Sequence, residues 1–237
     1  LGQSLWLDNI TRGMLDDGTL ARYIADLHVT GLTSNPSIFN LAIKNSSFYD
    51  AAITEKVTRG LSGERLFFEL AIEDLARAAD LFRPVHDRTA GIDGWVSLEV
   101  SPHLAYDAAA TLAAARDLHG RAARPNLFIK IPGTREGLPA IEEATFAGIP
   151  VNVTLLFTRE QYLAVANLRG IERRIDAGLC PRVCSVASLF ISRWDSASAA
   201  KLPAHLKNTL GIAIGGRCYE AYRSCLLYTS PSPRDRG

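Results

Sequence analysis

The sequence contains little cysteine and almost no excess of charge of either sign. Its four cysteines, spread over positions 180 to 225 of a 237-residue chain, are too few for a disulfide framework. The 26 basic and 25 acidic side chains leave a formal net charge of +1. A chain without a global positive field has no general means of holding a polyanion, so we expect neither nucleic acid nor an acidic membrane surface as a partner.

Long hydrophobic runs are absent as well. No apolar run approaches the roughly 20 residues of a membrane span, and residues 1–4 lack the basic and apolar regions of a signal peptide. The sequence therefore predicts a cytoplasmic protein. The five histidines have no metal-binding spacing, and the three residues between Cys180 and Cys184 favour idle thiols over a zinc site. We expect no metal and no organic cofactor.

The two ends of the sequence are unusual. The chain begins with Leu1 rather than Met, which indicates that an N-terminal piece is missing. From Cys225 onward a helical pattern gives way to serine- and proline-rich sequence without apolar periodicity. We therefore expect residues 1–224 to form one domain, incomplete at both ends, and residues 225–237 to be a non-native or disordered tail.

Short apolar runs alternate with helical segments along the chain. Strict alternation of strand and helix implies parallel β/α units with right-handed crossovers. Helical periodicity is clearest in residues 66–82 and 105–119, and Thr158 followed by Gln161 is a capping box that places a helix start after the fifth strand. The apolar runs predict six strands, at residues 4–9, 29–34, 95–100, 126–131, 151–156 and 183–190.

Two folds fit parallel β/α units: a doubly wound sheet and a (β/α)8 barrel of the TIM type. No glycine-rich phosphate loop follows the first strand, where the sequence reads DNIT (residues 8–11), so the barrel is favoured. About sixty residues separate the second and third strands, and their helical periodicity predicts extra helices. Residues 195–224 look helical and no seventh strand follows, so we expect the barrel to be truncated after about six strands.

Side chains alternate between the two faces of a strand, so each predicted strand has an apolar face and an opposite face. In the fifth strand, for example, we expect Val151, Val153 and Leu155 to face the helices. In four strands the opposite face carries polar groups near the carboxyl end, where the active sites of barrels lie. These polar residues are Asp8, Glu99, Lys130, Asn152 and Thr154.

A lysine inside a barrel suggests a nucleophile. Burial among apolar and aromatic groups favours the neutral form of an amine, and a neutral amine attacks carbonyl carbons. Carboxylates at the same site can transfer protons. The residues therefore point to Schiff-base catalysis on a ketone or aldehyde, with Lys130 as the nucleophile and the carboxylates of Asp8 and Glu99 for proton transfer.

Four segments of the chain carry a family resemblance. They are GLTSNPSIF (residues 31–39), NLFIKIPGT (126–134), GIPVNVTLLF (148–157) and SLFISR (188–193). The first resembles the signature of the transaldolases, the second resembles the strand of their active-site lysine, and the other two are similar to further blocks of that family. The resemblance covers nearly all of the chain before residue 225.

The resemblance implies transfer of a dihydroxyacetone unit in the pentose phosphate pathway. The donor would be sedoheptulose 7-phosphate or fructose 6-phosphate, and the acceptor an aldose phosphate such as erythrose 4-phosphate or glyceraldehyde 3-phosphate. Lys130 would form the Schiff base. Glu99 would transfer protons through a water held with Thr154, and Asp8 would take the proton from the C4 hydroxyl of the donor.

The resemblance also implies a set of substrate-binding residues. They are Asn35 and Asn152 for the donor hydroxyls, Ser188 beside the dihydroxyacetone unit, Phe190 near the water site, and Arg193 for one half of a phosphate clamp. On the residues alone, an ion pair between Arg193 and Asp195 is a competing interpretation of that arginine.

Two alternatives to a transaldolase stay open. A related Schiff-base aldolase of the fructose-6-phosphate type would release the three-carbon unit instead of transferring it, but Phe190 and the long insertion after the second strand favour the transferase. The other alternative is an inactive fragment. A complete barrel takes about 250 residues and eight strands, so we expect the chain as given to be inactive or unstable.

Overall fold

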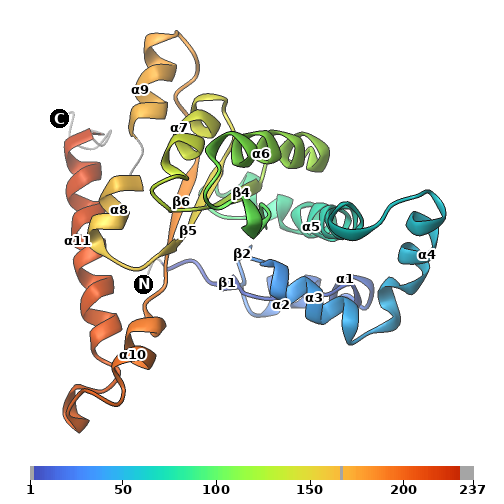
Figure 1. The fold of residues 1–237 in the computed structure, drawn as a ribbon, viewed down its shortest axis with the longest axis horizontal. Coiled ribbons are helices and arrows are strands. Elements are labelled where there is room, and N and C mark those ends of the chain that lie inside the picture. The colour runs from blue at the N-terminus through green and yellow to red at the C-terminus, as the bar shows by residue number, and fades with distance from the viewer. Residues whose placement is uncertain (1–2, 166–167, 230–237) are drawn as a thin grey trace.

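Six parallel strands, hydrogen-bonded in their sequence order, form the centre of the structure (Figure 1). The structure is a computed structural model and describes residues 3–165 and 168–229. The strands are β1 (Trp6–Leu7), β2 (Gly31–Leu32), β3 (Trp95–Glu99), β4 (Leu127–Pro132), β5 (Val151–Leu156) and β6 (Ser185–Leu189). This curled half-barrel has the strand order of the first six units of a (β/α)8 barrel, so the predicted α/β fold is confirmed.

Helices follow the strands and cover the outer face of the sheet. Helices α1 (Arg12–Asp16) to α5 (Gly63–Arg88) belong to the first two units, and α5 lies between α6 (Ala108–Ala122) and the group of α1, α2 (Thr19–Asp26) and α3 (Pro36–Lys44) (Figure 1). The others are α4 (Asp50–Thr58), α7 (Leu138–Phe146), α8 (Arg159–Val165), α9 (Leu168–Asp176), α10 (Ser192–Ser198) and α11 (Leu210–Thr229). Three short 3-10 helices are η1 (Ser47–Tyr49), η2 (Pro102–Leu104) and η3 (Ala204–Leu206). Within the described ranges, no helix has the length and apolar character to cross a membrane.

Local sequence signals account for several helix boundaries. The expected extra helices after β2 are α3, α4 and α5. The predicted capping box is present, because the Thr158 hydroxyl accepts a hydrogen bond from the Gln161 N–H at 3.1 Å, directly before α8. Helix α6 begins at Ala108 rather than at residue 105, because Asp107 caps it by accepting from the Ala110 N–H.

The end of the chain falls partly outside the described residues. Helix α11 continues to Thr229, so the first five residues of the expected tail are helical. Residues 230–237 lie outside the described residues, and the boundary at residue 225 stays a prediction.

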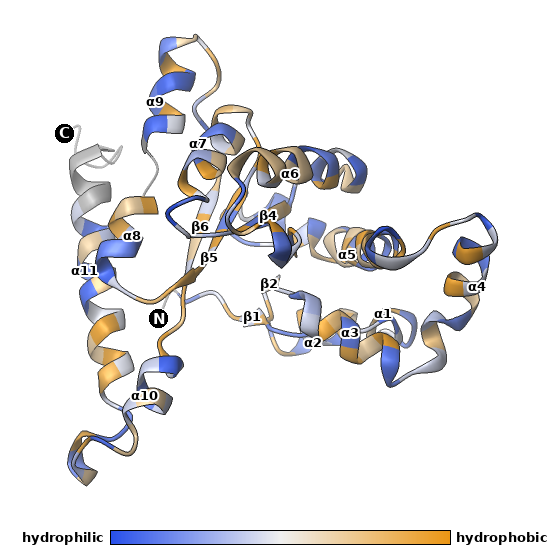
Figure 2. Cartoon of the chain, viewed as in Figure 1, coloured by the Kyte–Doolittle hydropathy of each residue, from blue (hydrophilic) through white to orange (hydrophobic). Residues whose placement is uncertain are grey.

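The hydrophobic core lies between the middle strands and helices α5, α6 and α7. All six residues of β4 are buried, as expected for a strand covered on both faces. The β6 side is more open. Figure 2 shows α9 as largely hydrophilic and the part of α11 nearest α10 as hydrophobic, and Ile212 in that part is 69% exposed.

The side-chain alternation in β5 is interrupted at Leu155, so the prediction that Leu155 faces the helices is wrong. Leu155 is 42% exposed and has a left-handed φ of 60°. The register with β6 shifts between Val153 and Leu156, as in a β-bulge, and Leu156 takes the buried place in the core. The alternation holds up to Thr154 and changes faces after it.

Stacked aromatic rings fill the inner face of the half-barrel on the amino-terminal side of Lys130. The Phe128 ring lies 4.0 Å from that of Trp95 and 6.3 Å from that of Trp6, centroid to centroid. Gly31, on β2 between Trp6 and Trp95, leaves the space for the indole of Trp6. A Cβ at position 31 would lie 2.5 Å from Cε2 of Trp6.

We expect Gly31→Ala to lower the free energy of unfolding by about 1–3 kcal/mol, because the added methyl group forces the indole out of its place. The matched control is Gly120→Ala in α6, where nothing lies within 4 Å of the added Cβ. That change should leave stability unaltered or raise it by up to about 1 kcal/mol. Urea denaturation of both variants measures the difference, and equal effects would show that the indole yields without cost.

Candidate active site

The amino group of Lys130 lies buried at the centre of the inner face of the sheet. Lys130 is 5% exposed, and its Nζ donates a hydrogen bond to the main-chain oxygen of Ser34 at 3.0 Å. Nζ also lies 3.3 Å from Oε2 of Glu99. The register pairs Lys130 with Glu99 on β3 and with Asn152 on β5, so parallel pairing alone places these three predicted residues side by side.

Glu99 is the last residue of β3 and its carboxylate is mostly buried. Burial raises the pKa of Glu99 above its ordinary value of 4.5, while the charge and hydrogen bond of the Lys130 ammonium act in the opposite direction. A carboxyl group with a raised pKa beside an amine is suited to giving and taking protons near neutral pH.

A line of hydrogen bonds joins the inner faces of β3, β5 and β6. The Asn152 amide donates from Nδ2 to the hydroxyl of Ser97 at 3.1 Å, and its Oδ1 accepts from the hydroxyl of Ser188 at 2.7 Å. These contacts fix the orientation of the amide beside Lys130. Thr154, also predicted, is buried two residues further along β5 on the same face.

The ends of β1 and β2 carry the next two predicted residues. Asn35 directly follows Ser34, and its Oδ1 caps α3 by accepting from the Ile38 N–H at 3.0 Å. Asp8 directly follows β1 and is exposed. In the described part of the chain, Asp8 makes no hydrogen bond or ion pair with another predicted site residue.

Phe190 and Arg193 follow β6. The ring centroids of Phe190 and Phe157 lie 5.9 Å apart. The main-chain N–H of Phe190 donates a hydrogen bond to the main-chain oxygen of Leu156. Arg193 is exposed on α10. Asp195 accepts a hydrogen bond from the Gly211 N–H, and no ion pair between Arg193 and Asp195 is found among the described residues. The structure thus brings together Lys130 and its neighbours on β3, β5 and β6, but not Asp8 or Arg193.

Two residues of the site were not predicted. Ser34 holds Lys130 through its main-chain oxygen, and its hydroxyl donates to the oxygen of Ser97 at 2.8 Å. Ser97 accepts a second hydrogen bond through its hydroxyl, from the Asn152 amide. The signal for Ser97 was its place on the same face as Glu99, whereas no side-chain pattern predicts the role of a main-chain oxygen.

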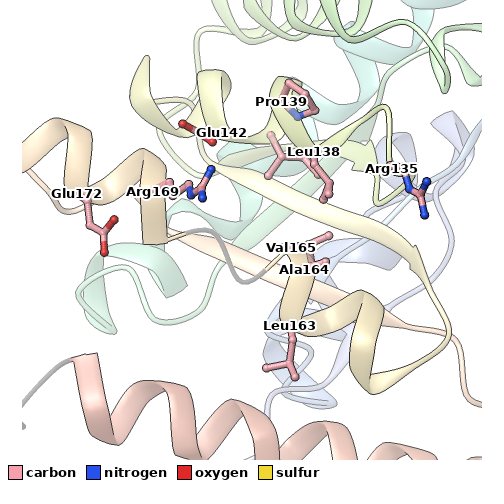
Figure 3. Close-up of a pocket in the computed structure, with 10 residues that line it drawn as sticks. Arg135, Leu138, Pro139, Glu142, Leu163, Ala164, Val165, Arg169 and Glu172 are labelled. Atoms are coloured by element: carbon pink, nitrogen blue, oxygen red, sulfur yellow. The ribbon is translucent and has the colours of Figure 1, made fainter.

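A pocket of about 660 Å³ lies elsewhere, between α7, α8 and α9 (Figure 3). Its lining includes Arg135, Glu142 and Arg169, and none of the predicted site residues. Among residues 3–165 and 168–229, no three His, Cys, Asp or Glu side chains are grouped in a way that could hold a metal ion.

These features define a TIM-type β/α protein with a buried lysine–carboxylate pair toward the carboxyl ends of its strands. The chain belongs to the transaldolase/fructose-6-phosphate aldolase family, which it matches over residues 5–231. Three similar proteins are named transaldolase, from Thiobacillus denitrificans, Arthrobacter sp. (strain FB24) and Acidothermus cellulolyticus. Their identities to this chain are 45%, 43% and 48%, over 94%, 93% and 82% of its length.

The chain spans 65%, 62% and 53% of the length of these three relatives, which is less than two thirds in each case. The resemblance read from the sequence is confirmed at the level of the family.

The ion pair of Lys130 and Glu99 predicts a pH-dependent loss of stability in Lys130→Met. Without the ammonium, burial alone acts on Glu99, and its pKa should rise further. The unfolded chain then releases a proton that the folded chain retains, so the stability of the variant should fall as the pH rises above about 4.5 toward neutral pH.

Urea denaturation over a pH series measures this effect. The control is the double variant Lys130→Met/Glu99→Gln, which has no carboxyl group to titrate at this position and should lose the added pH dependence. If both variants showed the same dependence on pH, Glu99 would not be the group responsible.

Proposed function

We propose that this protein transfers a dihydroxyacetone unit between sugar phosphates through a Schiff base on Lys130. The observation that carries the proposal is the buried Nζ of Lys130 with the Glu99 carboxylate 3.3 Å away. The relatives named transaldolase support the reaction class. As donors we propose sedoheptulose 7-phosphate and fructose 6-phosphate, as acceptors erythrose 4-phosphate and glyceraldehyde 3-phosphate, and as location the cytoplasm.

The reaction begins at the carbonyl carbon of the donor. The Lys130 ammonium first passes a proton to the Glu99 carboxylate 3.3 Å away, and the amine so formed adds to the carbonyl carbon. Glu99 then returns that proton to the hydroxyl of the adduct, which leaves as water when the C=N bond forms. Thr154 holds the water through which Glu99 acts. Burial of the amine beside a carboxyl group of raised pKa favours both steps.

Cleavage then requires a base at the C4 hydroxyl. Asp8 takes that proton, the bond between C3 and C4 breaks, and its electrons pass into the protonated imine to give an enamine on Lys130. An aldose phosphate leaves, and the acceptor aldehyde adds to the enamine by the reverse steps. Asp8 follows β1 at the same end of the sheet as Glu99, which supports this separate role.

The remaining polar residues bind substrate in this proposal. Asn35, Asn152 and Ser188 meet the hydroxyls of the three-carbon unit, and Arg193 meets a phosphate group. The network of Asn152 with Ser97 and Ser188 supports a fixed orientation of its amide. Phe190 carries no hydroxyl that could activate water, which supports transfer of the three-carbon unit over its release by hydrolysis.

We expect borohydride with fructose 6-phosphate to fix a three-carbon adduct on Lys130, because hydride reduces the C=N bond to a stable secondary amine. Peptide mapping by mass spectrometry, on protein expressed from its complete gene, locates the adduct. Lys56 is equally buried but lies on α4 in an ion pair with Glu73, and it should remain unmodified. Lys130→Met should abolish the adduct and Lys44→Met, at an exposed position, should not. An adduct on Lys44 or Lys56 would contradict the proposed function.

Asp8 and Glu99 should act on different steps, because they lie on different strands and meet the substrate at different atoms. Asp8→Asn should accumulate the donor imine but release aldose phosphate at least about 100-fold more slowly. Glu99→Gln should slow formation of the imine itself. Rapid quenching with borohydride measures the first step, and release of glyceraldehyde 3-phosphate from fructose 6-phosphate measures the second. Equal losses in both steps for both variants would refute this division.

A further inference from the structure

A partly buried group of charged side chains joins the start of α1 to α5. Arg12, the first residue of α1, donates from Nε to Oδ1 of Asp74 at 2.8 Å and from Nη2 to Oε2 of Glu73 at 2.9 Å. The hydroxyl of Tyr49 accepts from the main-chain N–H of Arg12 at 3.0 Å and donates to Oδ2 of Asp74 at 2.9 Å. The Arg12 guanidinium also lies over the Tyr49 ring, 4.8 Å from its centroid.

The geometry of this group is tightly determined. Asp74 is 0% exposed, and each of its carboxylate oxygens accepts one of the hydrogen bonds described. Lys56 forms an ion pair with the second carboxylate, Glu73. Buried charges are tolerated only when their partners satisfy them, so a displacement of Arg12 would leave Asp74 unpaired. The first turn of α1 therefore has one favourable position on α5.

The segment between β1 and α1 is short and fixed at both ends. At its start, the Leu7 oxygen accepts from the Thr33 N–H at 2.8 Å. At its end, the Thr11 hydroxyl caps α1 by accepting from Met14, and Arg12 follows at once. Ile10 is buried in the hydrophobic core between them. Asp8 and Asn9 are the exposed residues of this segment, so the place of Asp8 depends on the anchor four residues later.

We propose that Arg12 is a positioning residue, which holds the β1–α1 segment through Asp74, Glu73 and Tyr49 so that Asp8 meets the C4 hydroxyl during carbon–carbon bond cleavage. This inference rests on the proposed function. It concerns the cleavage step alone, because Glu99 and Lys130 are held by the sheet and have no contact with the Arg12 group in the described structure.

The test uses protein expressed from its complete gene and the two measurements of the separate steps. Arg12→Met should form the borohydride-trapped imine at the unsubstituted rate and release glyceraldehyde 3-phosphate about 10- to 100-fold more slowly, because a base displaced by about 1 Å loses that much in rate. Arg12→Lys keeps the charge but cannot reach both carboxylates. Its rate of glyceraldehyde 3-phosphate release should lie between the rates of the unsubstituted protein and Arg12→Met.

The control is Arg77→Met. Arg77 also joins α5 to α1, through Asp16 at 2.6 Å, but this ion pair is half exposed and lies at the far end of α1 from Asp8. Both steps should keep their rates in this variant. Where Arg12→Met does not fold, as shown by loss of a cooperative melting transition, Arg12→Lys carries the comparison.

The deciding experiment uses the double variant Asp8→Asn/Arg12→Met. If Arg12 acts through Asp8, adding Arg12→Met to Asp8→Asn should slow cleavage no further, because the residue being positioned is already disabled. A further loss in the double variant, an equal loss in imine formation and cleavage, or cleavage at the unsubstituted rate in Arg12→Met would each overturn the inference while Lys130 still carries the adduct. Failure of the unsubstituted protein to form that adduct would instead overturn the proposed function.

Discussion

An ammonium group inside a parallel sheet must find acceptors, because an uncompensated buried charge costs several kcal/mol. At Lys130 the sheet itself supplies them. The β3–β4 register places Glu99 beside the lysine, and the end of β2 brings the Ser34 oxygen to 3.0 Å from Nζ. The Ser34 hydroxyl in turn ties β2 to the main chain of β3. The contacts of Lys130 therefore depend on the register of the central strands, and a change in register would disrupt both the pairing and the site.

The groups of the site are held in two different ways. Glu99, Lys130 and Asn152 stand on consecutive paired strands, so their mutual distances are as rigid as the hydrogen-bonded ladder. Asp8 lies between β1 and α1, and Arg193 lies on α10, so strand pairing holds neither of them. In the proposed reaction, the strand residues form the imine, and the residues after strands handle the part of the substrate that leaves or arrives.

The sequence predicted the residues on paired strands better than those outside the strands. Alternation along a strand is a local rule, so it correctly predicted that Glu99, Lys130 and Asn152 would share the inner face. It was wrong at Leu155, because a bulge depends on the neighbouring strand and leaves no mark in the alternation itself. The Arg12 group could not be predicted, since Asp74 lies 62 residues away and its burial follows from helix packing. The strands β1 and β2 were predicted longer than the two residues that pair.

The sequential strand order also has a consequence for folding. Every pair of neighbours in the sheet joins strands that are consecutive in the chain, so each new unit can add to a finished one as synthesis proceeds. The segment that joins β2 to β3, residues 33–94, is longer than any other connection between neighbouring strands. Loop closure costs entropy that grows with the logarithm of length, and α5 shortens the effective distance by packing on β3. Packing of α5 on β3 therefore favours this one long closure.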